Sequence, residues 1–181
     1  MAVCALSGER EFMRHTVSAV MLALLLPAAA FAQADGPSQA LSTNPLGLIV
    51  KWPNIEYERR ITPSATFGAS SSAFVDEGEA NVSMLVRWYP DRIALRGFYL
   101  GARAGVFHFR TYEYDIRSYR ESAATLPGAG VEIGYNWLLG PSRNVMIGTG
   151  FGLTRILDGG HSWSVPEVLP ALRLVNIGIA F

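Results

Sequence analysis

Cysteine is almost absent from this 181-residue chain, which holds only Cys4. A single cysteine excludes a disulfide framework and any zinc or iron–sulfur site built from several cysteines. The chain also has no excess of charge, because 15 Lys and Arg residues balance 15 Asp and Glu residues. Lysine occurs only at Lys51, and no block of basic residues is present. We therefore expect no nucleic-acid partner, since such partners are bound through phosphate neutralisation.

The N-terminal segment has the three parts of a secretory signal peptide. Basic residues precede an apolar run over 17–31, and small residues with the spacing of a cleavage site follow. The run is shorter than the ~20 residues of a membrane-spanning helix, and a proline interrupts it. We predict a signal peptide over 1–32, cleaved after Ala32 or Ala34, and a flexible leader over 33–44.

Beyond residue 44 the chain lacks the apolar spacing of an amphipathic helix and alternates with a period of two. Apolar residues take nearly every second position in the five clearest segments, which are 81–89, 97–107, 128–137, 144–154 and 171–181. Each segment is close to the ~9–11 residues of a tilted membrane strand. The sequence therefore predicts an all-β chain.

The second face of these strands is rich in glycine, including Gly101, Gly105, Gly130, Gly134, Gly148, Gly150, Gly152 and Gly178. Glycine weakens an exposed strand, but inside a narrow barrel it leaves room for large polar side chains. We therefore predict that the apolar face meets lipid and that the aromatic residues near its strand ends form an interfacial girdle. The charged residues Glu56, Glu58, Arg87, Arg103 and Glu132 then share the lumen and can form ion pairs there.

Short connections alternate with longer, more polar ones, as in outer-membrane barrels, which have an even number of strands. Seven strands are predicted over 54–61, 64–74, 81–89, 97–111, 124–139, 144–156 and 169–181. Parity requires an eighth, which we place over 45–52 with Pro53 and Asn54 as a tight turn; one unbroken strand across Pro53 is the alternative. The prediction is an eight-stranded antiparallel up-and-down transmembrane β-barrel over 45–181.

The stretch Leu174–Phe181 resembles the C-terminal signal of bacterial outer-membrane β-barrel proteins, which ends in an aromatic residue read by the barrel assembly machinery. Four further segments, Ile55–Arg59, Arg87–Pro90, Gly97–Ala102 and Val131–Trp137, resemble a family of small Gram-negative outer-membrane β-barrel domain proteins, of the OmpA/OmpX size class. The resemblance covers 45–181. It implies the cell outer membrane, contact with lipid and lipopolysaccharide, and Phe181 as the assembly signal. It implies no particular activity, because one barrel hosts many functions.

An enzymatic alternative involves His161, Ser162, Ser164 and Glu167. Lipid A deacylases, outer-membrane barrels of similar size, use a His-x-Ser pair with a downstream Glu. Here the serines follow the histidine by one and three residues, so on a strand both would lie on the opposite face. The pair Glu56 and Glu58 could also suggest acid/base chemistry, but arginines on the same face favour ion pairs. His108 has no second ligand at usable spacing, so we expect no metal site. We also expect no cofactor and no catalytic residue.

Tyrosine and charge alternate over 111–121, where Tyr112, Tyr114, Tyr119 and Arg120 are the best candidates for contacts outside the cell, because Tyr and Arg are favoured at protein interfaces. The function we expect is a non-enzymatic outer-membrane barrel with a filled lumen and a structural or surface-contact role. Two alternatives remain, an outer-membrane lipid-modifying enzyme and a soluble periplasmic ligand-binding barrel. The latter requires the glycine-rich face to point outward.

Overall fold

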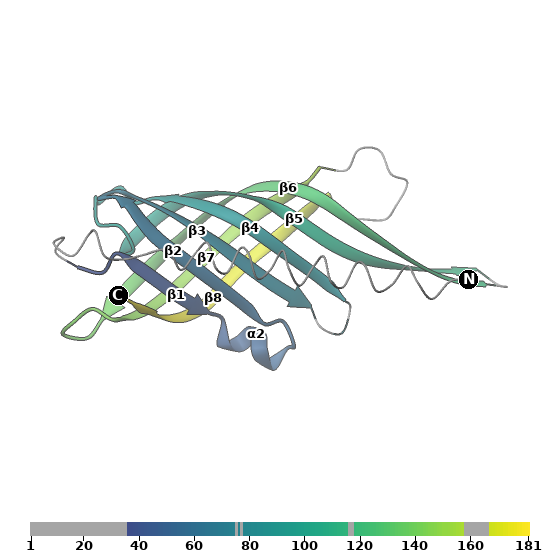
Figure 1. Cartoon of the computed structure of the whole chain (residues 1–181), viewed down its shortest axis with the longest axis horizontal. Helices are drawn as coiled ribbons and strands as arrows, with labels where there is room; N and C mark the ends of the chain where they lie inside the picture. Colours follow the sequence, from purple (N-terminus) through teal and green to yellow (C-terminus); the bar gives the residue numbers. More distant parts are fainter. Residues whose placement is uncertain (1–35, 75, 77, 116–117, 158–166) are drawn as a thin grey trace, which may run out of the picture. The chain divides into compact units, whose positions relative to one another are not determined.

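The computed structural model describes residues 36–74, 76, 78–115, 118–157 and 167–181. These residues form a closed barrel of eight strands, each antiparallel to its neighbours and hydrogen-bonded in sequence order (Figure 1). The strands are β1 (Gln39–Thr43), β2 (Asn54–Thr62), β3 (Ala65–Phe74), β4 (Glu79–Trp88), β5 (Gly97–Asp115), β6 (Ser118–Leu139), β7 (Val145–Ile156) and β8 (Val168–Ala180). The period-two alternation thus predicted the fold correctly. The expected signal peptide lies outside the described residues.

The first strand lies earlier in the chain than predicted. β1 falls within the expected flexible leader, whereas the segment 45–52 begins with a short helix, α2 (Pro45–Ile49). Asn44 caps this helix, because its Oδ1 accepts from the backbone N–H groups two and three residues further on. The placement over 45–52 was wrong because β1, at five residues, is too short to show alternation. No helix of the described chain is both long and apolar enough to cross a membrane.

β5 and β6 extend beyond the other strands as one long hairpin (Figure 1). Their backbones pair from Gly97 opposite Asn136 to Asp115 opposite Ser118. The sequence predicts a loop over 112–123, so this part of the prediction is wrong. Tyrosine and threonine favour extended backbone, and they allow the ladder to continue where the apolar alternation stops.

Short connections close the opposite end of the barrel, where the chain also reaches Phe181 (Figure 1). The connection between β4 and β5 folds back into the lumen here. Leu95 is completely buried against inward-facing residues of β1, β7 and β8, namely Ala40, Ala180 and Met146. Ala94 packs with Tyr89 and Tyr99 in a second buried cluster. We call these two clusters the apolar plug; its members are Ala40, Tyr89, Ala94, Leu95, Tyr99, Met146 and Ala180. The apolar plug fills the short-turn end of the lumen.

Candidate functional site

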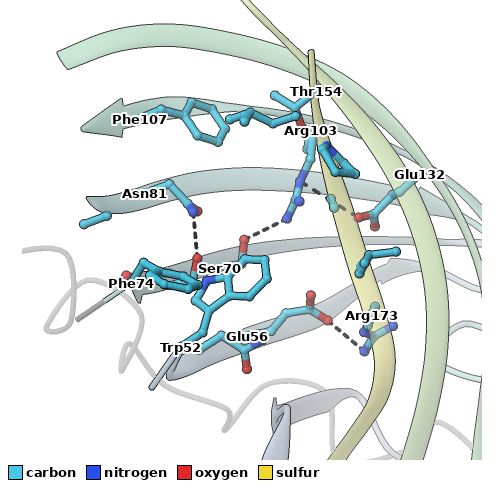
Figure 2. Close-up of a pocket in the computed structure, with 18 of the residues that line it drawn as sticks. Trp52, Glu56, Ser70, Phe74, Asn81, Arg103, Phe107, Glu132, Thr154 and Arg173 are labelled. Carbon is cyan, nitrogen blue, oxygen red and sulfur yellow. Dashed lines mark hydrogen bonds and ion pairs between the residues drawn. The ribbon is translucent and has the colours of Figure 1, made fainter. Parts of the chain in front are cut away.

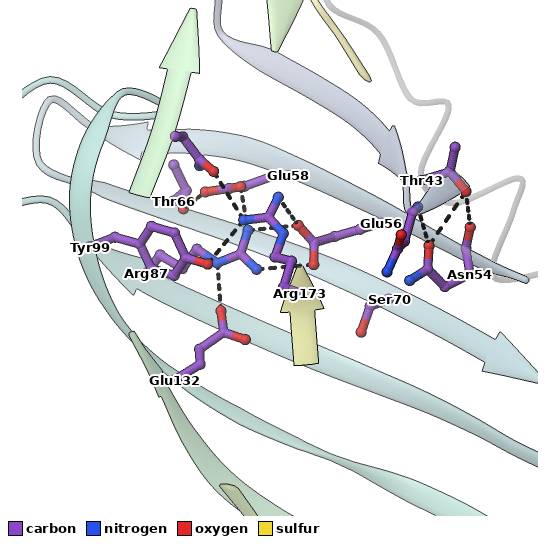
Figure 3. Close-up of polar contacts among 12 residues, drawn as sticks. Thr43, Asn54, Glu56, Glu58, Thr66, Ser70, Arg87, Tyr99, Glu132 and Arg173 are labelled. Atoms are coloured by element: carbon purple, nitrogen blue, oxygen red, sulfur yellow. Dashed lines mark hydrogen bonds and ion pairs between the residues drawn. The ribbon is translucent and has the colours of Figure 1, made fainter. Parts of the chain in front are cut away.

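Arg87 lies at the centre of the lumen and binds three glutamates that project from β2 and β6 (Figure 3). Its Nη1 donates to Glu56 Oε1 at 2.7 Å and to Glu58 Oε2 at 2.6 Å. Its Nε donates to Glu132 Oε1 at 2.5 Å. The Arg87 side chain is 0% exposed, so every one of these contacts is shielded from bulk water. The structure thus brings together four of the five charged residues assigned to the lumen from the sequence.

Gly101 makes the contact between Arg87 and Glu132 possible. It pairs with Arg87 on one side and with Glu132 on the other, so these two side chains belong to strands that are not neighbours. A Cβ at this glycine would lie 2.7 Å from Glu132 Cγ and 3.2 Å from Arg87 Cγ. The ion pair between Arg87 and Glu132 therefore occupies the space that a side chain at position 101 would fill.

Two hydroxyl groups complete the hydrogen bonds of Glu58, and an amide supports one of them. Thr66 Oγ1 and Tyr89 OH both donate to Glu58 Oε1, at 2.5 Å and 2.6 Å. Asn136 Nδ2 in turn donates to Tyr89 OH at 3.0 Å. Because buried carboxylates are stable only when their oxygens are paired, this second layer lets the charge remain in the lumen.

Arg173 on β8 is part of the same cluster, although the sequence did not identify it. Its Nη2 lies 2.8 Å from Glu56 Oε1, and its Nη1 donates to Tyr99 OH at 2.9 Å. The β7–β8 ladder shifts register between Gly148 and Gly150, so Leu174 and Val175 are both exposed on the outside. Strict alternation fails at such a bulge. The signal was present as two adjacent apolar residues flanked by Arg173 and Asn176.

Arg103 lies at the edge of this cluster rather than at its centre (Figure 2). Its Nη2 donates to Ser70 Oγ at 3.1 Å, while its Nε is 3.9 Å from Glu132 Oε2. We call the six charged residues the lumen cluster; its members are Glu56, Glu58, Arg87, Arg103, Glu132 and Arg173. With three arginines and three glutamates the cluster is formally neutral.

A cavity of about 340 Å³ occupies the lumen between the lumen cluster and the hairpin end (Figure 2). Arg103 and Arg173 contribute to it from the cluster, and Trp52, Phe74 and Phe107 are among its aromatic walls. The rings of Trp52 and Phe74 lie 5.8 Å apart. Since the lumen cluster and the apolar plug lie on one side of this cavity, it ends blindly within the barrel.

The outer surface of the barrel carries large apolar side chains in place of charge. The outward positions of the strands include Val82, Met84, Val86, Leu100, Val106, Val131, Ile133, Phe151, Leu153, Leu172, Ile177 and Ile179, all exposed. We call this surface the apolar belt. Outward-facing aromatic residues follow at the short-turn end of the strands, where Trp88 is 51% and Trp137 43% exposed.

The remaining candidates from the sequence have separate positions. His108 Nδ1 lies 2.9 Å from Thr125 Oγ1, and the described residues contain no group of three or more His, Cys, Asp or Glu side chains arranged to hold a metal ion. His161, Ser162 and Ser164 lie outside the described residues, while the backbone oxygen of Glu167 accepts from Ile156 N. For Tyr112, Tyr114, Tyr119 and Arg120 the structure describes only the backbone, which is part of the β5–β6 hairpin.

Comparison with protein-family models matches residues 19–163 to a family described as a protein of unknown function, DUF3575. The chain belongs to the DUF3575 family. The matched region includes the DUF3575 strands that carry Arg87 and its three glutamates, and it ends before Arg173. Among solved structures, the N-terminal β-barrel domain of Pseudomonas aeruginosa OprF matches with a TM-score of 0.49 and 12% identity, covering 81% of this chain and 98% of that chain. No curated protein matches the chain.

Proposed function

We propose that this DUF3575 protein is an integral protein of the cell outer membrane, a barrel closed to ion flow that has a structural or surface-contact role and no enzymatic activity. The observation that carries the proposal is the apolar belt. Removing this much apolar surface from water is favourable by about 25 cal/mol per Å², and lipid is the solvent that does so around a whole barrel.

The distribution of polarity supports lipid outside the barrel. Charged side chains, among them Arg87 and Glu58, lie inside, and the glycine-rich face points inward with them. A soluble ligand-binding barrel has the reverse arrangement, with an apolar interior and a polar exterior. The arrangement of the faces therefore argues against the soluble alternative.

Lengths and ends support the same proposal. β2, β3, β4, β7 and β8 have between 9 and 13 residues, close to the ~9–11 that cross a bilayer at a tilt. The short connections fit the periplasmic side, and the β5–β6 hairpin fits the outer surface. In this orientation Tyr112, Tyr114, Tyr119 and Arg120 would be available for contacts with lipopolysaccharide or another surface partner.

Membrane fractionation tests the proposal. Membranes from cells producing the full chain are washed with urea and with carbonate, and the protein is followed in the pellet. We expect it to stay in the outer-membrane fraction and to show a folded band on unheated gels that shifts on boiling. Release by either wash would contradict integration into the membrane.

The non-enzymatic part of the proposal needs a separate measurement. Lipid A from cells with and without the protein is compared by mass spectrometry, with a His161→Ala variant as the matched control. We expect identical acyl composition in all three samples. Loss of an acyl chain that depends on His161 would establish the lipid-modifying alternative instead.

A further inference from the structure

Arginines gather at the short-turn end of the barrel, around a pocket of about 230 Å³. Arg60 comes from the end of β2, Arg92 and Arg96 from the β4–β5 connection, and Arg143 from the β6–β7 connection. We call these four residues the arginine pocket. Three separate parts of the chain thus direct positive charge to one place.

Within the described part of the chain, the arginine pocket carries more positive than negative charge, and no carboxylate is ion-paired to it. None of its four side chains forms an ion pair or a side-chain hydrogen bond there, in contrast to Arg87 and Arg173 in the lumen cluster. The short connections carry one acidic side chain, Asp91. Like charges that share a pocket repel one another, so the arrangement is stabilised by a bound anion.

Two of these arginines also have a backbone conformation that favours glycine. Arg92 has φ 57° and Arg143 has φ 54°, both in the left-handed region. Gly97 and Gly140, in the same two connections, have φ 89° and 86°. The two connections thus hold glycine, the buried Leu95 (φ 70°) and two arginines at left-handed positions, and the two arginines are the ones that line the pocket. Arginine carries more backbone strain than glycine at these two positions, which points to a role for its side chain.

Outward-facing tryptophans lie on the strands next to the arginine pocket. Trp88 and Trp137 are outward-facing at the ends of β4 and β6, next to the connections that carry Arg92 and Arg143. Tryptophan in a membrane barrel marks the boundary between hydrocarbon and headgroups. In a bilayer, the arginines on the adjacent connections would lie on the headgroup side of that boundary, where lipid phosphates are found. Guanidinium groups bind phosphate oxygens through pairs of charge-assisted hydrogen bonds.

We propose that the arginine pocket binds the phosphate of an anionic phospholipid headgroup in the leaflet that faces the short connections. The proposal rests on the proposed function, because it requires the apolar belt to lie in a bilayer. Bound lipid would offset part of the positive charge of the pocket and hold the short-turn end of the barrel at a fixed depth.

The test compares folded full-length protein in vesicles of phosphatidylcholine alone and of phosphatidylcholine with phosphatidylglycerol. The variant Arg92→Gly/Arg143→Gly removes two pocket charges and relieves two left-handed positions. We expect phosphatidylglycerol to raise the urea midpoint of the native protein but not that of the variant. In phosphatidylcholine alone, the midpoint of the variant should be at least as high as that of the native protein. Affinity for phosphatidylglycerol should fall roughly tenfold or more.

A control variant, Lys51→Gln/Arg155→Gln, removes the same charge from the opposite end and should respond to phosphatidylglycerol as the native protein does. An equal loss in this control would show a general charge effect and overturn the pocket. A second arm adds inorganic phosphate to protein in phosphatidylcholine vesicles; full stabilisation by phosphate, with no further gain from phosphatidylglycerol, would overturn the lipid assignment. Failure of the native protein and of both variants to integrate into vesicles would contradict the proposed function. Integration of the native protein without any preference for phosphatidylglycerol would contradict only this inference.

Discussion

Arg87 on β4 and Glu132 on β6 are 45 residues apart in sequence and are joined by a 2.5 Å hydrogen bond. The bond passes over Gly101 of β5, the strand that lies between them. The strand between them contributes Gly101, which has no side chain to fill the gap. The contact therefore ties β4 to β6 directly, in addition to the backbone ladder around the barrel. Three such ties meet at Arg87, since Glu56 and Glu58 reach it from β2.

Replacement of Arg87 should destabilise the barrel more than replacement of any other residue of the lumen cluster. Arg87→Ala leaves three buried carboxylates without their common partner, and breaking a buried pair in this way costs about 3–5 kcal/mol. Urea unfolding in detergent micelles, followed by the heat-modifiable band, measures the loss. Arg103→Ala is the matched control, and we expect about 1 kcal/mol, because Arg103 has one hydrogen bond to Ser70 and only a distant ion pair. Equal losses would show that Arg87 is not central.

Gly101→Val should disrupt the lumen cluster without removing any charge. The new side chain would overlap Glu132 Cγ and press on Arg87, and overpacking of this kind costs about 1–3 kcal/mol. Ala102→Val places the same side chain one residue further on, where it faces outward and is exposed. Urea midpoints of both variants are compared with that of the native protein. A similar loss for both would contradict the assignment of the two faces.

Deletion of Phe181 should impair assembly by removing a side chain and a piece of backbone together. Its backbone oxygen accepts from Ser38 N and Gln39 N, and its N–H donates to Gln39 O. Phe181→Ala keeps these bonds and removes only the ring. If the ring is the assembly signal, the yield of folded protein in the outer membrane falls in both variants. A defect confined to the deletion would show that barrel closure, and not recognition of the aromatic ring, is what the residue provides.

The purified protein should show no steady, large conductance in a planar bilayer. Eight strands enclose a lumen that side chains can fill, whereas open porins use about 16–18 strands. Leu95 and Tyr99 are both 0% exposed, and the ion-paired Arg87 and Arg173 lie over the Tyr99 ring. Reproducible single-channel steps from folded, contaminant-free protein would contradict a blocked lumen, and protein boiled before reconstitution serves as the control.

Most of the fold follows from alternation, and its errors have physical causes. A period of two separates outward Val86 from inward Arg87 wherever a strand is long and regular, so the faces of β4, β5 and β6 were predictable. β1 was not predicted because its five residues, two buried, one exposed and two intermediate, are too few to make a detectable pattern. The β5–β6 ladder over 112–123 was not predicted, because backbone pairing beyond the apolar belt needs no apolar residues.

The lumen cluster was predictable in membership but not in geometry. Glu56, Glu58, Arg87 and Glu132 were grouped correctly because they share a face. The central position of Arg87 depends on strand register, which places Arg87 and Glu132 on opposite sides of Gly101, whereas Arg103 lies opposite Leu85 and Gly130. Arg173 was missed because a bulge reverses the alternation ahead of it, and bulge positions follow from tertiary closure rather than from local pattern.

The strands do not contribute equally to closing the barrel. β1 pairs with β8 from Ala40 opposite Ala180 to Thr43 opposite Ile177, with Phe181 bonded to Ser38 and Gln39 beyond that ladder. Its ladder to β2 is as short, from Gln39 opposite Arg59 to Ser42 opposite Glu56. Parting either ladder breaks few hydrogen bonds and creates two unpaired strand edges, each able to accept a strand from elsewhere. We therefore expect the barrel to open first at β1, which is held by short ladders on both sides, and last at the long β5–β6 hairpin.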